Sequence, residues 1–165
     1  MHIMKELRII DILLVEDNPG DIRLTQEALK EGKIKNKLNV VTDGEEAIAF
    51  LKKNGIYKDA PTPDLILLDL NLPKKDGREV LIESKSSPEL ARIPIIILTT
   101  SDAEKDIADM YANHANAFIT KPVDYNEFIN VVRSIENFWL TIVKLPAKEN
   151  LSAHTTLNVI KSHNA

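Results

Sequence analysis

The chain has 165 residues, of which 44% are hydrophobic and 28% are charged, and its formal net charge is −4. This composition predicts one folded domain rather than a disordered chain, and its acidic balance argues against nucleic acid as a partner. The absence of cysteine excludes disulfides, thiolate metal sites and a cysteine nucleophile. With no apolar run of membrane-spanning length and no signal-peptide pattern, we expect a cytoplasmic protein without membrane contacts.

Five apolar runs predict buried strands, and amphipathic patterns between and after them predict helices. In chain order, strands are expected at residues 9–15, 38–41, 65–68, 95–98 and 117–119, and helices at 18–32, 42–51, 78–85, 101–113 and 124–142. This fivefold alternation predicts an α/β fold with a parallel sheet and helices on both faces. The folded domain is expected over residues 9–146, and a polar C-terminal tail over 147–165.

Residue types at the helix starts support these positions. Asn18 followed by Pro19 is typical of an N-cap and first turn, and Gly32 is typical of a helix end. Three pairs have the spacing of a capping box: Thr42–Glu45, Ser101–Glu104 and Asp124–Glu127.

Polar side chains stand at the expected carboxyl ends of four strands. They are Glu16 and Asp17 after the first strand, Asp69 after the third, Thr99 after the fourth and Lys121 after the fifth. Because all strands of a parallel sheet end on one side, we expect these groups to converge at one edge.

The chemistry of this group of side chains is specific. Three carboxylates in one place repel one another unless a divalent cation binds them, and oxygen ligands alone indicate Mg²⁺ or Mn²⁺. A lysine and a hydroxyl beside the cation suit a phosphoryl group. Asp69 is then the candidate nucleophile, because a carboxylate can accept a phosphoryl group as an aspartyl phosphate.

Four ordered motifs resemble those of the receiver domains of two-component response regulators. They occupy residues 14–18, 68–77, 98–99 and 121–122, and the resemblance covers residues 9 to about 143. It implies a flavodoxin-like (βα)5 three-layer sandwich with strand order 2-1-3-4-5, a fold in which ligands bind at the carboxyl ends of the strands. It also implies a phosphoacceptor that promotes its own phosphotransfer and dephosphorylation rather than an enzyme.

The resemblance also implies roles for individual residues. Asp69 would accept the phosphoryl group from a phosphohistidine of a sensor histidine kinase. Asp17, Asp69 and the backbone carbonyl of Asn71 would bind Mg²⁺, and Glu16 would act through water.

The receiver resemblance also implies roles for the motifs at residues 98–99 and 121–122. Thr99 and Lys121 would contact the phosphoryl oxygens, and the Lys121–Pro122 peptide would be cis. Thr99 and Phe118 would occupy the switch positions, although Phe118 lacks the hydroxyl of the tyrosine found in many receivers.

Three further stretches, residues 70–81, 119–124 and 138–146, are similar to the small single-domain regulators that partner cyanobacterial phytochrome histidine kinases. This likeness implies a phytochrome-type kinase as partner, no output domain, and signalling through protein–protein contacts. It also implies a homodimer formed through the last helix region.

Two other functions compete with this one. A hydrolase of the haloacid-dehalogenase type would need a second aspartate two positions after its nucleophile, where this chain has Asn71, which cannot transfer protons in that role. A receiver-like module that binds partners without phosphorylation stays open as the alternative.

The last predicted helix is apolar nearly all round its circumference, with Phe138, Trp139 and Ile142 among the contributing residues. One face can pack on the sheet, but the other faces need a second cover. That cover is either the polar tail or a second copy of the chain, and we favour the homodimer.

Overall fold

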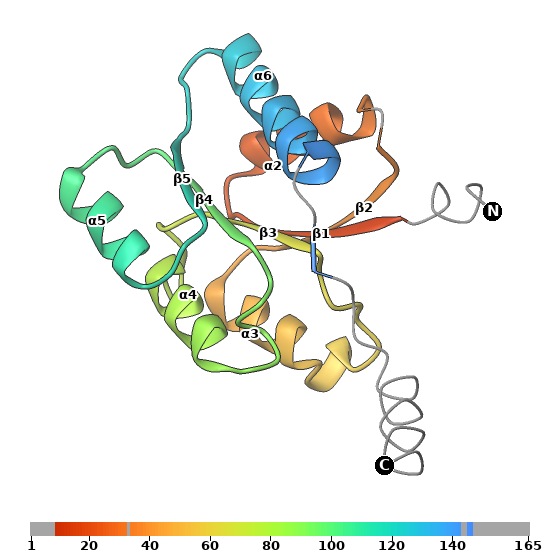
Figure 1. The fold of residues 1–165 in the computed structure, drawn as a ribbon, viewed down its shortest axis with the longest axis vertical. Helices are drawn as coiled ribbons and strands as arrows, with labels where there is room; N and C mark the ends of the chain where they lie inside the picture. Colours follow the sequence, from red (N-terminus) through yellow and green to blue (C-terminus); the bar gives the residue numbers. More distant parts are fainter. Residues whose placement is uncertain (1–8, 33, 143–144, 147–165) are drawn as a thin grey trace, which may run out of the picture.

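A single parallel sheet forms the middle layer of the fold, and helices cover both of its faces (Figure 1). The computed structural model describes residues 9–32, 34–142 and 145–146. Helices α2 and α6 lie on one face, and α3, α4 and α5 lie on the other. Among the helices of this described part, none has the length and apolar character needed to cross a membrane.

The five strands lie in the order β2-β1-β3-β4-β5, and every neighbouring pair is parallel. Their bounds are β1 (Ile10–Val15), β2 (Asn36–Val41), β3 (Leu65–Leu68), β4 (Ile95–Thr99) and β5 (Ala117–Thr120). The α/β class and the flavodoxin-like order 2-1-3-4-5 are therefore confirmed.

The helices alternate with the strands as expected. Their bounds are α2 (Pro19–Lys30), α3 (Gly44–Lys52), α4 (Gly77–Ser86), α5 (Glu104–Ala112) and α6 (Tyr125–Ile135), with a 3-10 turn η1 (Gly55–Tyr57) and a π-helix η2 (Glu136–Ile142). Each crossover returns the chain to the same end of the sheet, which is why all five strands can run in parallel.

The central strand β3 explains the two hydrophobic cores. Ile66 and Leu68 point into the core on the α3 side, whereas Leu65 and Leu67 point into the core under α2 and α6. All four side chains are at most 1% exposed, as expected for a strand covered on both faces.

Two of the expected helix starts are shifted. The cap of α3 is Asp43, not Thr42: its carboxylate accepts the Glu46 N–H at 2.8 Å, and the Glu46 carboxylate accepts the Thr42 N–H at 3.2 Å. The Glu46 carboxylate therefore holds Thr42 and not the capping residue Asp43, so the capping box expected from Thr42 and Glu45 is wrong. The first residue of α3 has to be glycine, since a Cβ on Gly44 would lie 1.8 Å from the Lys75 carbonyl oxygen.

The capping box expected at Ser101 and Glu104 is wrong. Helix α5 begins at Glu104, and the residue before it, Ala103, provides no side-chain cap. The Ser101 hydroxyl instead donates to Asp106 at 2.5 Å, and the Ser101 carbonyl accepts the Thr120 hydroxyl at 3.1 Å. This contact with β5 keeps the segment out of the helix. The caps Asn18 and Asp124 are confirmed.

The last helix also departs from the prediction, because its α-helical part ends at Ile135 and continues as η2. The first residue of η2, Glu136, is buried, and its Oε1 accepts the Ile34 N–H at 3.4 Å. Gly32, expected as a helix end, makes room for this carboxylate, since a Cβ there would lie 1.9 Å from Glu136 Oε2. The side chain of Ile142 and the expected tail at 147–165 lie outside the described residues.

Candidate functional site

The predicted site residues meet at the carboxyl edge of the sheet. Glu16 and Asp17 directly follow β1, Asp69 follows β3, Thr99 ends β4 and Lys121 follows β5. The backbone fixes this meeting, because the Asp69 N–H donates to the Val15 carbonyl at 3.0 Å. The Lys121 N–H likewise donates to the Thr99 carbonyl at 2.6 Å.

Three carboxylates form an acidic cluster, defined here as Glu16, Asp17 and Asp69. One oxygen from each lies within 4.8 Å of the others. Glu16 and Asp69 are only 2% and 7% exposed, whereas Asp17 is exposed. Hard oxygen donors at this spacing fit Mg²⁺ or Mn²⁺, and the exposed side suits the water ligands that Mg²⁺ retains.

The buried ammonium group of Lys121 balances part of this negative charge. Its Nζ donates to Glu16 Oε2 at 2.5 Å, to Asp21 Oδ2 at 2.9 Å and to Asp69 Oδ2 at 3.2 Å. An ammonium group has three N–H donors, so all three are used. Sequence analysis missed Asp21 as a site residue, and its position four residues after Asp17 in the first helical turn was the available signal.

The pKa values of Glu16 and Lys121 follow from their burial and from these hydrogen bonds. Burial raises the pKa of the Glu16 carboxyl to about 7, against the lowering effect of Lys121 and of the Asn18 N–H. Burial alone would lower the pKa of Lys121, but the hydrogen bonds to Glu16 and Asp21 outweigh it and raise the pKa above its ordinary value. Lys121 therefore stays a cation at this edge.

Thr99 carries a hydroxyl that is fully buried and that has no hydrogen-bond partner among the described residues. A buried polar group without a partner is unfavourable, so this hydroxyl is free to bind a water molecule or an oxygen of another group. At the end of β4, next to the strand that carries Asp69, this hydroxyl fits an oxygen-rich group attached to Asp69.

The loop after Asp69 is held close to the start of α4. The Gly77 N–H donates to the Leu70 carbonyl at 2.9 Å, and a Cβ on Gly77 would lie 2.1 Å from the Asp69 carbonyl oxygen. Only glycine permits this close approach, so it fixes the direction in which the chain leaves Asp69.

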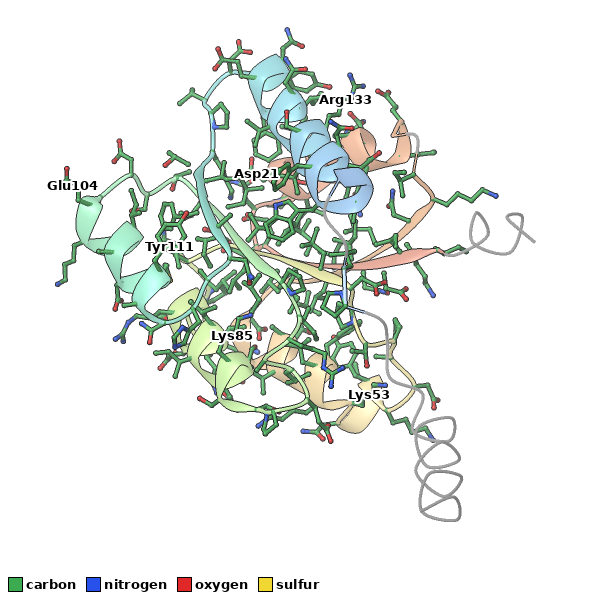
Figure 2. All side chains as sticks on the ribbon, viewed as in Figure 1. Asp21, Lys53, Lys85, Glu104, Tyr111 and Arg133 are labelled. Atoms are coloured by element: carbon green, nitrogen blue, oxygen red, sulfur yellow. The ribbon has the colours of Figure 1, made fainter. Side chains whose placement is uncertain are left out.

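Two further expected residues, Asn71 and Phe118, lie near the site, and the structure adds Tyr111 as a partner of Phe118. Asn71 is exposed, and its N–H donates to Asp69 Oδ1 at 3.4 Å. Phe118 is half-buried against the core on the α3 side, and its N–H donates to the hydroxyl of Tyr111, at 3.1 Å. Figure 2 labels Tyr111 on α5, beside β5.

The expected cis bond before Pro122 is wrong, because no peptide bond between described residues is cis. Cis costs an X–Pro bond only about 0.5–1 kcal/mol, so the surroundings and not the proline decide its form. Here the chain leaves β5 in the trans form while the Lys121 side chain still reaches the acidic cluster.

The model of the response regulator receiver domain family matches residues 12–133 of this chain. The chain belongs to this family of signalling domains. It is 52% identical over 136 residues to the response regulator Rcp1 of Synechocystis sp., an alignment that covers 82% of this chain and 92% of Rcp1.

Two solved structures have the same fold. The Mn²⁺-bound form of Rcp1 has a TM-score of 0.81 at 51% identity, covering 84% of this chain and 99% of that one. The phosphorylated cyanobacterial phytochrome response regulator RcpA has a TM-score of 0.83 at 51% identity, covering 85% and 100%. The expected receiver family is confirmed, and the acidic cluster agrees with the expected Mg²⁺ or Mn²⁺ site.

Removing a carboxylate from the acidic cluster tests the cation site. We expect Asp17→Asn to weaken Mg²⁺ binding by at least about tenfold, since changes even in the outer shell of a bound metal cost that much. Isothermal titration calorimetry measures the dissociation constant. Asp124→Asn, at the exposed N-cap of α6, is the matched control and should leave it unchanged. Equal Mg²⁺ affinity in Asp17→Asn and wild type would contradict this assignment.

Proposed function

We propose that this receiver is a two-component response regulator that accepts a phosphoryl group on Asp69 from a sensor histidine kinase. The observation that carries the proposal is the position of Asp69, a nearly buried carboxylate beside two other carboxylates, a lysine and an unpartnered hydroxyl. We further propose that it works in the cytoplasm, through proteins and not through nucleic acid.

The reaction begins with an in-line attack by an Asp69 carboxylate oxygen on the phosphorus of a phosphohistidine. The new O–P bond forms as the P–N bond breaks, and the departing imidazole nitrogen takes a proton from solvent. A divalent cation held by Asp17, Asp69 and the Asn71 carbonyl, with Glu16 acting through water, would neutralise charge on the transferred group.

Two side chains of the chain itself stabilise the product. Lys121 gives an N–H to one phosphoryl oxygen in exchange for its bond to Asp69, and the Thr99 hydroxyl gives its unused donor to another. The same groups support self-catalysed transfer and later hydrolysis, so we propose a phosphoacceptor and not an enzyme with a separate substrate.

Phosphorylation also supplies a signal. It adds about −1.5 to −2 charges at Asp69, and movement of Thr99 toward them changes the packing between β4, α5 and β5. We propose Phe118 as the second switch position, because it lies on β5 and packs against the hydrophobic core on the α3 side of the sheet. The Tyr111 hydroxyl, which accepts the Phe118 N–H, links that strand to α5.

Incubation with acetyl phosphate tests the phosphoacceptor. We expect intact-protein mass spectrometry to show one added phosphoryl group in wild type with Mg²⁺, because Asp69 is the nucleophile. The adduct should disappear with chelator and in Asp69→Asn. If wild type folds and binds Mg²⁺ but takes no phosphoryl group, the phosphorylation-independent binding module becomes the better function.

The kinase partner is proposed to be a cyanobacterial-type phytochrome. The support is the similarity to RcpA, described as a cyanobacterial phytochrome response regulator, across 85% of this chain. Similarity at this level extends over the strand ends and the helices around them, which is where a kinase must bring its phosphohistidine.

Phosphotransfer competition tests the kinase class. An autophosphorylated cyanobacterial phytochrome kinase should transfer to wild type at least about tenfold faster than a histidine kinase from an unrelated pathway, because partner choice rests on differential binding. Loss of the labelled phosphohistidine with time measures both rates. Equal rates would remove the phytochrome proposal and leave the phosphoacceptor proposal in place.

A homodimer through the C-terminal helix region is proposed on the apolar surface found there. Phe138 is 50% exposed, and Trp139 is partly buried next to it with the rings 5.8 Å apart. The two side chains border a surface hollow of about 510 Å³ that also includes Ile119 and Pro122. Ile142, at the end of η2, is proposed as the third interface residue.

Replacing the central aromatic side chain tests the dimer. We expect wild type to be a dimer by multi-angle light scattering and Trp139→Asp to be a monomer, because a charge at the interface centre is buried without a partner. Ile56→Asp changes a side chain that is 89% exposed on η1 and should leave the dimer intact. A monomeric wild type would end this proposal.

A further inference from the structure

Asp21 contacts the site without belonging to the acidic cluster. It lies in the first turn of α2, which Figure 2 shows against the sheet, and its Oδ2 accepts Lys121 Nζ at 2.9 Å. The two residues are 100 positions apart in the sequence. The carboxylates within 4.8 Å of one another are those of Glu16, Asp17 and Asp69, so Asp21 is not among the candidate cation ligands.

The position of Asp21 is fixed from two sides. Its N–H donates to Asn18 Oδ1 at 3.0 Å, and its carbonyl accepts the Thr25 hydroxyl at 2.8 Å. Thr25 is itself buried. The Asp21 backbone therefore stays in place while groups at the strand ends change partners.

The other two partners of Lys121 have competing tasks. Glu16 and Asp69 share the acidic cluster, and Asp69 also carries the proposed phosphoryl group. When these carboxylates turn toward a cation, the lysine loses one or both of them. Its ammonium lies at the end of a flexible four-carbon stem, and the whole side chain is only 4% exposed, so solvent cannot readily replace a lost partner.

We propose that Asp21 is a positioning residue that holds the Lys121 ammonium at the site during phosphotransfer to Asp69. The inference rests on the proposed phosphoacceptor function. One N–H of the lysine stays on Asp21, while the N–H that now contacts Asp69 turns to a phosphoryl oxygen. The fixed bond lowers the freedom that the lysine stem must lose in the transition state.

If Asp21 acted only through its negative charge, removing it would change the phosphorylation rate in the opposite direction. Asp21 adds a negative charge near an anionic phosphodonor, so removing it would raise the rate of phosphorylation if repulsion were its main effect. The direction of the rate change therefore separates positioning from long-range repulsion.

The test compares Asp21→Ala and Asp21→Asn with wild type. Phosphorylation of Asp69 by acetyl phosphate gives the rate, and isothermal titration calorimetry gives the Mg²⁺ dissociation constant. We expect Asp21→Ala to lower the rate by about tenfold, with Asp21→Asn in between because its amide oxygen still accepts one N–H. The Mg²⁺ dissociation constant should stay within about threefold of wild type, since Asp21 is no ligand.

A double-mutant cycle shows whether the effect passes through the lysine. In a Lys121→Ala background, Asp21→Ala should change the rate by less than about twofold, because the group that it positions is gone. Glu27→Gln is the matched control: it removes a charge from the same helix, where Glu27 pairs with Arg23, and should leave the rate unchanged. Asp21→Asn keeps the side-chain shape and serves if Asp21→Ala fails to fold.

Three results would overturn the inference. They are an unchanged or faster rate in both Asp21 variants, a loss of the same size in the Lys121→Ala background, and a parallel loss of Mg²⁺ affinity. An unphosphorylated wild type would instead contradict the proposed function itself, and with it this inference.

Discussion

One buried ammonium group balances the negative charge at the carboxyl edge of the sheet. Lys121 donates to Glu16, Asp21 and Asp69, and with Asp17 the edge holds four carboxylates against one lysine. Burial disfavours the charged form of these carboxyl groups and raises the pKa of Glu16, and the nearby charge of Asp69 adds a smaller effect in the same direction. An edge with this excess of negative charge favours the binding of a divalent cation.

The sheet is what makes such a concentration of charge possible. β1, β3 and β4 have almost no exposed apolar side chain, so their burial holds the strand ends in place against the local repulsion. Parallel pairing then brings the groups after β1, β3 and β5 to one side. The stability of the core thus supports a site whose own charges oppose one another.

The buried Thr99 hydroxyl complements this arrangement. Lys121 is paired with Glu16, Asp21 and Asp69, whereas Thr99 Oγ1 lacks a partner in the described part of the chain. The site therefore combines a lysine whose donors are all used with a hydroxyl donor that is free for a new oxygen. Such a site can exist in two states that differ in which oxygen atoms the lysine and the threonine contact.

Local patterns in the sequence determined the elements and most of the site. The apolar run 65–68 identified a strand buried on both faces, and Asn18 and Asp124 identified helix starts, because these signals depend on residues a few positions apart. The polar groups at the strand ends identified the acidic cluster, since parallel strands end on one side. The positions at the strand ends were enough to place Asp17, Asp69, Thr99 and Lys121 at one edge of the sheet.

Tertiary structure decided the features that depend on distant contacts. Asp21 joined the site only because the Lys121 side chain reaches from the end of β5 to the first turn of α2. The cap of α3 is Asp43 instead of Thr42, and the Ser101 carbonyl accepts the Thr120 hydroxyl of β5 while Ser101 caps no helix. The residues next to Glu136 and Pro122 likewise did not predict the change to a π-helix or the trans form of the bond before Pro122. Local propensities differ by amounts comparable to one packing contact, so long-range packing determines the exact position.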